Sequence, residues 1–174
     1  LKIVSARAGN VIGGGDWSHN RLIPDCIRAW SKEETVILRS PNSTRPWQHV
    51  LEPLSGYLSL AINLSLNKEL NGKSFNFGPS EMSTKSVLDL VKNMAQYWPR
   101  VKWNLEEMNN DFHESALLKL NCDLAHELLK WYPKLDFEST TRMTALWYKN
   151  YYDSDISNIR EFTSKQINDY MNFK

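Results

Sequence analysis

Residues 6–17 read Ala-Arg-Ala-Gly-Asn-Val-Ile-Gly-Gly-Gly-Asp-Trp, residues 21–25 read Arg-Leu-Ile-Pro-Asp, and residues 45–50 read Arg-Pro-Trp-Gln-His-Val. A hydrophobic strand over residues 2–8 stops at a glycine, and a glycine triplet, an acid and two arginines in loops follow it. Glycines allow close approach of the backbone to a ligand, and side chains at a strand end meet ligands in open α/β sheets. The pattern predicts an α/β protein with one wall of a site for a phosphorylated ligand. The alternative for the glycines is an ordinary turn.

Composition narrows the classes of partner. The chain has 174 residues, 41% of them hydrophobic, and a net charge of +1, which suits one domain with a real core. The balanced charge gives no indication of a nucleic-acid or anionic-membrane partner, and no apolar run approaches membrane-spanning length. Cys26 and Cys122 form no Cys-x-x-Cys and the histidines are scattered, so we expect two buried free thiols and no metal site.

Hydrophobic periodicity gives the order of elements. Breaks fall at glycine and proline positions, and the last helix is polar enough to predict a loose extension of the chain. We expect strands over residues 2–8, 35–38, 73–77, 101–105 and 117–120, helices over residues 21–32, 53–66, 86–98, 122–130, 137–152 and 154–173, and loops over residues 9–20, 39–46 and 106–115.

Three arginines lie near the glycine loop. A planar guanidinium gives two charge-assisted bonds to pyrophosphate, although an arginine in a loop is more often only solvated. Arg45 is the strongest candidate, because Pro46 stiffens the loop that presents it. Arg7 and Arg21 are the other two, and Asn10 follows the strand end, where its alternative role is an Asx turn.

Four segments together carry a family resemblance. They are residues 6–17, residues 21–25, residues 45–57 (Arg-Pro-Trp-Gln-His-Val-Leu-Glu-Pro-Leu-Ser-Gly-Tyr) and residues 76–79 (Asn-Phe-Gly-Pro). They resemble the CDP-glucose 4,6-dehydratases, a family of extended short-chain dehydrogenases/reductases, and the resemblance covers about residues 3–150. The glycine triplet favours this family over dTDP-glucose dehydratases and UDP-galactose epimerases, which usually carry an Asn-Val-Tyr-Gly-Pro type of loop there.

The resemblance implies an α/β fold that is the C-terminal part of a Rossmann-type extended short-chain dehydrogenase/reductase, with its small α/β substrate-binding domain. Residues 1–9 and 47–79 would be the remaining strands and helix of the Rossmann sheet. Residues 10–46 and 80–153 would form the substrate-binding domain, and residues 154–174 a helical C-terminal extension.

The resemblance also implies a lyase reaction, from CDP-glucose to CDP-4-keto-6-deoxyglucose and water. NAD+ would act as internal hydride carrier: a hydride leaves C4 of the glucose, water leaves across C5 and C6, and the hydride returns to C6. The implied setting is the bacterial cytoplasm, in a homo-oligomer when the protein is full-length. The product would feed dideoxysugars of surface polysaccharides such as O-antigen.

Residues that match the family's pattern inherit implied roles. Leu22 and Ile23 would pack near the cytosine, Arg45 would bind the pyrophosphate, and a His-Glu pair would lie near the ribose or the phosphates. The family continues that pair with alanine, where this chain has serine. The implied substrate-binding residues are Asn10, Gly15, Asp16, Trp17, Arg21, Leu22, Ile23, Arg45, His113 and Glu114, and the implied cofactor-binding residues are Arg7 and Ala8.

The family's glycine-rich dinucleotide fingerprint and catalytic Tyr-x-x-x-Lys would precede residue 1, so we expect no catalytic residue here, NAD held mostly elsewhere, and no turnover by this chain alone. Tyr170 and Lys174 have that spacing, but their place at the C-terminal end indicates coincidence. Two alternatives remain: another sugar-nucleotide epimerase or reductase, or a non-catalytic sugar-nucleotide-binding or scaffold half-protein. Nucleic-acid binding has little support from the charge.

Overall fold

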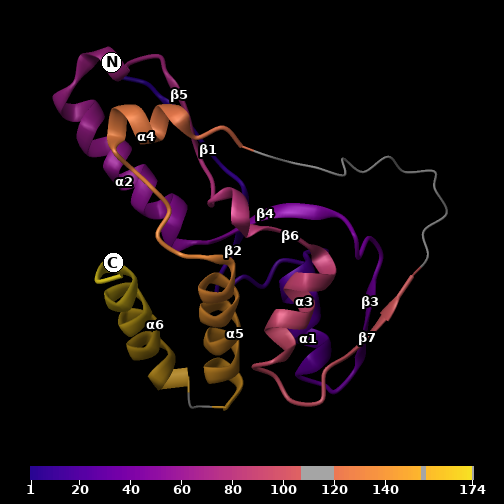
Figure 1. Cartoon of the computed structure of the whole chain (residues 1–174). Coiled ribbons are helices and arrows are strands. Elements are labelled where there is room, and N and C mark those ends of the chain that lie inside the picture. The colour runs from indigo at the N-terminus through magenta and orange to yellow at the C-terminus, as the bar shows by residue number, and fades with distance from the viewer. Residues whose placement is uncertain (107–119, 154–155, 174) are drawn as a thin grey trace.

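The computed structural model describes residues 1–106, 120–153 and 156–173, which form a mixed α/β fold (Figure 1). Its strands are β1 (Ser5–Ala8), β2 (Asn10–Ile12), β3 (Thr35–Leu38), β4 (Thr44–His49), β5 (Ser74–Phe77), β6 (Thr84–Ser86) and β7 (Lys102–Leu105). Its helices are α1 (Leu22–Trp30), α2 (Leu51–Leu66), α3 (Val87–Ala95), α4 (Asp123–Leu129), α5 (Phe137–Asp153) and α6 (Ile156–Met171), with short 3-10 turns η1 (Lys68–Leu70) and η2 (Glu81–Ser83).

The strands form three small sheets. β1 pairs with β5, β2 with β4 and β3 with β7, all in parallel, while β6 joins β4 antiparallel. Parallel neighbours need a long crossover, and α1 with β3 supplies the one between β2 and β4. The expected α/β class with parallel strands is therefore confirmed.

Two expected loops were wrong in part, because residues 9–20 contain β2 and residues 39–46 give way to β4. The proline in β4 argued against a strand. In the structure the first half of β4 pairs only with β6, and Pro46 lies opposite Thr84. The second half of β4 pairs only with β2, starting at Trp47 opposite Asn10. Pro46 therefore has a neighbouring strand on one side only, and its missing N–H group disrupts no second ladder.

Two apolar clusters form the core. The larger one joins α1, α3 and α5, and the other joins α2, α4 and β5 around Phe75 and Phe77, both fully buried. α1 turns one apolar stripe inward, as its spacing predicts, and α3 begins at a capping box in which Ser86 and Asp89 bond each other's backbone. Cys26 and Cys122 are both buried free thiols, as expected.

The prediction of a loosely attached last helix was wrong. α6 runs beside α5 as a hairpin (Figure 1). Trp147 Nε1 donates to Thr163 Oγ1 at 2.8 Å, and Gln166 Nε2 donates to the Met143 carbonyl oxygen at 2.8 Å. Tyr170 is buried in a third, small apolar cluster. Hydrogen bonds therefore supply much of the attachment of α6, which the spacing of its apolar residues did not indicate. Lys174 lies outside the described residues.

Candidate functional site

A cleft of about 1050 Å³ opens between the ends of β1 and β2, the start of α1, and β3 with the loop that follows it. Residues of β4 and α5 also line it, so its walls come from segments far apart in the sequence. The lining residues are Ala8, Gly9, Asn10, Val11, Ile12, Gly13, Asp16, Asn20, Arg21, Leu22, Ile23, Pro24, Asp25, Val36, Ile37, Leu38, Arg39, Ser40, Arg45, Trp47, Val87 and Tyr148.

Three arginines from three different loops or strands meet at this cleft. Arg21 Nη1 lies 3.6 Å from Asp16 Oδ2, and Arg39 Nε lies 4.0 Å from Glu106 Oε2. Arg45 Nη1 donates to the Thr44 carbonyl oxygen at 2.8 Å. The side chains of Arg21 and Arg39 are 66% and 81% exposed, so both guanidinium groups remain accessible to an anionic ligand.

Asp16 is the acid on this wall. Burial opposes its ionisation, but hydrogen bonds from Ser18 and the positive charges of Arg21 and Arg28 outweigh that effect and lower the pKa of the Asp16 carboxyl. Asp16 is therefore a carboxylate at neutral pH. It can accept hydrogen bonds from hydroxyl groups of a ligand, and it orients Arg21 before a ligand arrives.

The base of the cleft is apolar. Ile23 and Leu38 are almost completely buried, and Trp47 stands beside them with its indole N–H donating to the Lys85 carbonyl oxygen at 2.9 Å. Leu22 and Val36 extend this surface. A flat, uncharged ring can rest on such a surface while charged groups of the same ligand reach the arginines.

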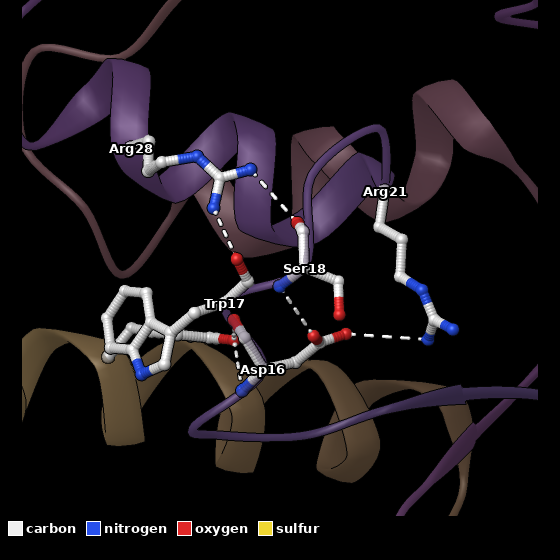
Figure 2. Close-up of polar contacts among 6 residues, drawn as sticks. Asp16, Trp17, Ser18, Arg21 and Arg28 are labelled. Atoms are coloured by element: carbon white, nitrogen blue, oxygen red, sulfur yellow. Dashed lines mark hydrogen bonds and ion pairs between the residues drawn. The ribbon is translucent and has the colours of Figure 1, made fainter.

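The loop that carries Asp16 is fixed by side chains from two helices (Figure 2). Tyr148 of α5 donates its hydroxyl to the Asp16 carbonyl oxygen at 2.7 Å and accepts from the Asp16 N–H at 3.1 Å. Arg28 of α1 donates Nη1 to the Trp17 carbonyl oxygen and Nη2 to the Ser18 carbonyl oxygen, both at 3.0 Å. Ser18 N–H donates to Asp16 Oδ1 at 2.9 Å.

The glycine triplet owes its composition largely to packing within the protein. A Cβ at Gly14 would lie 2.0 Å from the Trp147 indole of α5, and one at Gly13 would lie 2.7 Å from Val50 Cγ1. Gly15 has a φ of +82°, which disfavours any residue with a side chain. The sequence predicted that the backbone at these glycines approaches a ligand closely. At Gly14 the backbone instead approaches the Trp147 indole of α5.

Seven of the residues implied by the resemblance line the cleft together: Ala8, Asn10, Asp16, Arg21, Leu22, Ile23 and Arg45. The other described ones do not line it. Arg7 is exposed on β1, opposite Asn76 in the sheet, and Gly15 lies in the loop next to the Trp147 indole. Trp17 packs its indole against Tyr151 at a centroid distance of 4.9 Å. His113 and Glu114 lie outside the described residues.

Sequence reasoning missed two cleft residues that matter for its chemistry. Arg39 directly follows the strand predicted over residues 35–38, the same signal that marked Asn10, so it could have been found. Tyr148 gave no such signal, because it reaches the cleft from a helix 132 positions beyond Asp16.

His49, at the end of β4, and Glu52, in the first turn of α2, are buried polar side chains that bond to the protein itself. Burial lowers the pKa of His49 to about 4, and its Nδ1 accepts a long bond from the Leu51 N–H at 3.4 Å. Glu52 accepts bonds from the backbone N–H groups of Lys134 and Leu135 and from the Tyr170 hydroxyl. Neither lines the cleft.

Across the described ranges, no cluster of three or more His, Cys, Asp or Glu side chains could hold a metal, and no helix has the length and apolar character for crossing a bilayer.

No family model matches the chain. A curated protein matches nearly the whole of this chain: CDP-glucose 4,6-dehydratase of Salmonella typhimurium is 40% identical over 170 residues, which cover 97% of this chain. The chain is a relative of CDP-glucose 4,6-dehydratase. It spans about half the length of that relative, 46%.

Solved structures show the same fold. UDP-glucose-4-epimerase from Stenotrophomonas maltophila, with bound NAD and formylated UDP-arabinopyranose, superposes with a TM-score of 0.72 at 19% identity, over 87% of this chain and 48% of that one. dTDP-glucose 4,6-dehydratase from Bacillus anthracis, in complex with NAD, has a TM-score of 0.62 at 19% identity, over 84% and 44%. The fold is therefore that of the extended short-chain dehydrogenases/reductases, in about half of its usual length.

Proposed function

We propose that this chain is the sugar-nucleotide-binding, C-terminal part of a CDP-glucose 4,6-dehydratase, a lyase when joined to the rest of its fold. The observation that carries the proposal is one cleft in which Arg21, Arg39 and Arg45 stand above an apolar base. A sugar nucleotide combines a flat base, two charged phosphates and a hydroxyl-rich sugar. The cleft offers a complementary group for each of these parts.

The roles follow from chemistry. Arg45 and Arg39 would share the pyrophosphate, because paired guanidinium groups form bidentate, charge-assisted bonds with phosphate oxygens. Leu22 and Ile23 would pack against the cytosine. Asn10 and Asp16 would bond the sugar hydroxyls, and Arg21, held beside Asp16, would complete the phosphate end.

The cofactor site is only partly represented in this chain. When bound, NAD would accept the hydride from the glucose and later return it. Ala8 lines the cleft at the end of β1 and Arg7 precedes it, so these two fit the nicotinamide end of such a site. The sequence contains no G-x-G-x-x-G dinucleotide loop, and its glycine triplet is packed against Trp147. We therefore assign this chain the sugar-nucleotide side and expect the 174 residues alone not to turn over CDP-glucose.

We propose that the chain divides into three parts. We assign residues 1–9 and 47–79 to the Rossmann sheet, residues 10–46 and 80–153 to the substrate-binding domain, and residues 154–174 to a helical extension. The second cluster is built around Phe75 and Phe77 of the first unit, and α4 of the second unit packs onto it through Ala125 and Leu129. The first cluster, around Ile27 and Leu90, lies in the substrate-binding unit except for Trp47, and several of its members line the cleft.

Titration calorimetry tests the proposal. The purified chain is titrated with CDP-glucose, UDP-glucose, dTDP-glucose and free glucose, and CDP-glucose is expected to bind most tightly. Arg45→Gln should weaken CDP-glucose binding about tenfold or more, because a charge-assisted bidentate contact is lost. Arg100→Gln is the matched control, since Arg100 is 73% exposed and paired with Glu33 on the surface.

Three outcomes would count against the proposal. No heat with any sugar nucleotide would overturn it, and tighter binding of UDP-glucose or dTDP-glucose would assign the chain to another sugar-nucleotide enzyme. If the Arg45 and Arg100 variants lose CDP-glucose affinity equally, the pyrophosphate does not bind at Arg45 in this cleft. Release of water from CDP-glucose by the 174-residue chain would refute the expected inactivity.

A further inference from the structure

The backbone of residues 16–18 is hydrogen-bonded by the side chains of Tyr148 and Arg28, which come from two different helices. We propose that Tyr148 and Arg28 are positioning residues that preset this loop, so that Asp16 and Arg21 meet the sugar nucleotide in a fixed arrangement. This inference rests on the proposed function and deepens it. Figure 2 shows the loop with Arg28 and Arg21 on either side of it.

Tyr148 closes the loop from α5. Its side chain is fully buried, and its hydroxyl serves as donor to the Asp16 carbonyl oxygen and acceptor from the Asp16 N–H. A buried hydroxyl has no water to replace these partners, so the two bonds define one backbone geometry at Asp16. The ring is itself locked between the indoles of Trp17 and Trp147, each edge-on at a centroid distance of 5.4 Å.

Arg28 holds the other side of the same loop. Its two terminal nitrogens reach the successive carbonyl oxygens of Trp17 and Ser18, a forked geometry that lysine cannot reproduce. Asp25, one turn earlier on α1, forms an ion pair with the same guanidinium. The charge and donors of Arg28 are therefore committed to protein groups. Unlike Arg21, Arg39 and Arg45, Arg28 does not line the cleft and acts through the loop.

The two carboxylate oxygens of Asp16 therefore have different partners. Asp16 Oδ1 accepts from the Ser18 N–H, while Oδ2 faces Arg21 at 3.6 Å. One oxygen thus orders the loop, and the other stands with the Arg21 guanidinium at the wall of the cleft. Because the loop is ordered before binding, a ligand that uses Asp16 and Arg21 does not have to freeze it, and its affinity is higher for that reason.

The test measures the Kd of CDP-glucose by calorimetry for the wild-type chain and four variants, at a temperature where thermal denaturation shows all of them folded. We expect Tyr148→Phe to raise the Kd about five- to tenfold, because two hydrogen bonds to the loop are lost. Arg28→Met should raise it by a similar factor, with partial rescue in Arg28→Lys. Tyr152→Phe is the matched control: it removes a tyrosine hydroxyl from the same aromatic cluster and should leave the Kd unchanged.

A double-mutant cycle separates positioning from a general loss of stability. If Tyr148 acts through Asp16, Tyr148→Phe should cost little further affinity once Asp16→Asn is present. Additive effects, or variants that bind as tightly as the wild type, would overturn this inference alone. A wild-type chain without affinity for any sugar nucleotide would overturn the proposed function, and this inference with it.

Discussion

Replacing Glu52 with alanine should cost about 3–5 kcal/mol of unfolding free energy, because each buried donor left unpaired costs about 1–3 kcal/mol. Glu52 is 1% exposed, and its Oε1 accepts from the Lys134 N–H at 2.8 Å and the Leu135 N–H at 2.7 Å. Its Oε2 accepts from the Tyr170 hydroxyl at 2.9 Å. One carboxyl group therefore ties α2 to the segment before α5 and to the end of α6.

Protonation of Glu52 adds a pH signature to the same prediction. Burial raises the pKa of Glu52 above the ordinary value of 4.5, although the hydrogen bonds it accepts and the charge of Lys134 act in the other direction. The folded state therefore holds this proton more tightly than the unfolded chain. Its contribution to stability is present below pH 4.5 and is lost as the pH rises through the raised pKa. Glu52→Gln should remove this dependence.

Urea unfolding followed by tryptophan fluorescence measures the loss. The matched control is Glu33→Ala, which removes a carboxylate that is 60% exposed and pairs with Arg100 at 2.6 Å. Such surface pairs contribute about 0–1 kcal/mol, so the control should unfold almost like the wild type. If Glu52→Ala costs no more than Glu33→Ala, the hydrogen-bonded junction around Glu52 does not hold the fold together.

Three further predictions concern other closely packed positions. Gly14→Ala should cost about 1–3 kcal/mol or more in urea unfolding, because its Cβ would lie 2.0 Å from the Trp147 indole. Gly72→Ala, with nothing within 4 Å, should show only the cost of its φ of +79°; equal losses would refute the packing argument. Burial lowers the pKa of His49 from 6.5 to about 4, so its contribution of about 3 kcal/mol should be lost as the pH falls through that window. His49→Gln should flatten that part of the stability profile, and an unchanged profile would contradict burial as the cause. Burial raises the pKa of Cys26 to about 12, so its thiol should react with a disulfide reagent only as fast as the chain unfolds; rapid reaction of the folded protein would show that it is accessible.

The elements best predicted from the sequence are those whose spacing of apolar residues shows which face is buried. α1 and α3 each bury one face, and a helical period of apolar residues records that directly. β2 and β4 were missed because the signal for them is not local. The three residues Asn10–Ile12 become a strand only when Trp47 and its neighbours lie beside them, and Pro46 is tolerated only because one side of β4 is open there.

The cleft was foreseen in part for a similar reason. Arg21 and Arg45 stand out as arginines in loops, and the structure places both at one cleft. Asn10 marks a strand end, which open α/β sheets place near ligands. The sequence could not show that Tyr148 and Arg28 fix the loop at Asp16, because a helix records only which of its faces is buried, not what that face touches.

The sequence by itself determined the α/β class, most helices, the buried thiols and seven of the residues that line the cleft, since burial and turn chemistry act on neighbouring residues. Only the tertiary structure decided how those residues are used. It set Gly14 against Trp147, turned the polar face of α6 toward Glu52 through Tyr170, and gathered three arginines from separate segments around one cleft. Such contacts depend on distances between groups far apart along the chain, and no local pattern of residues specifies those distances.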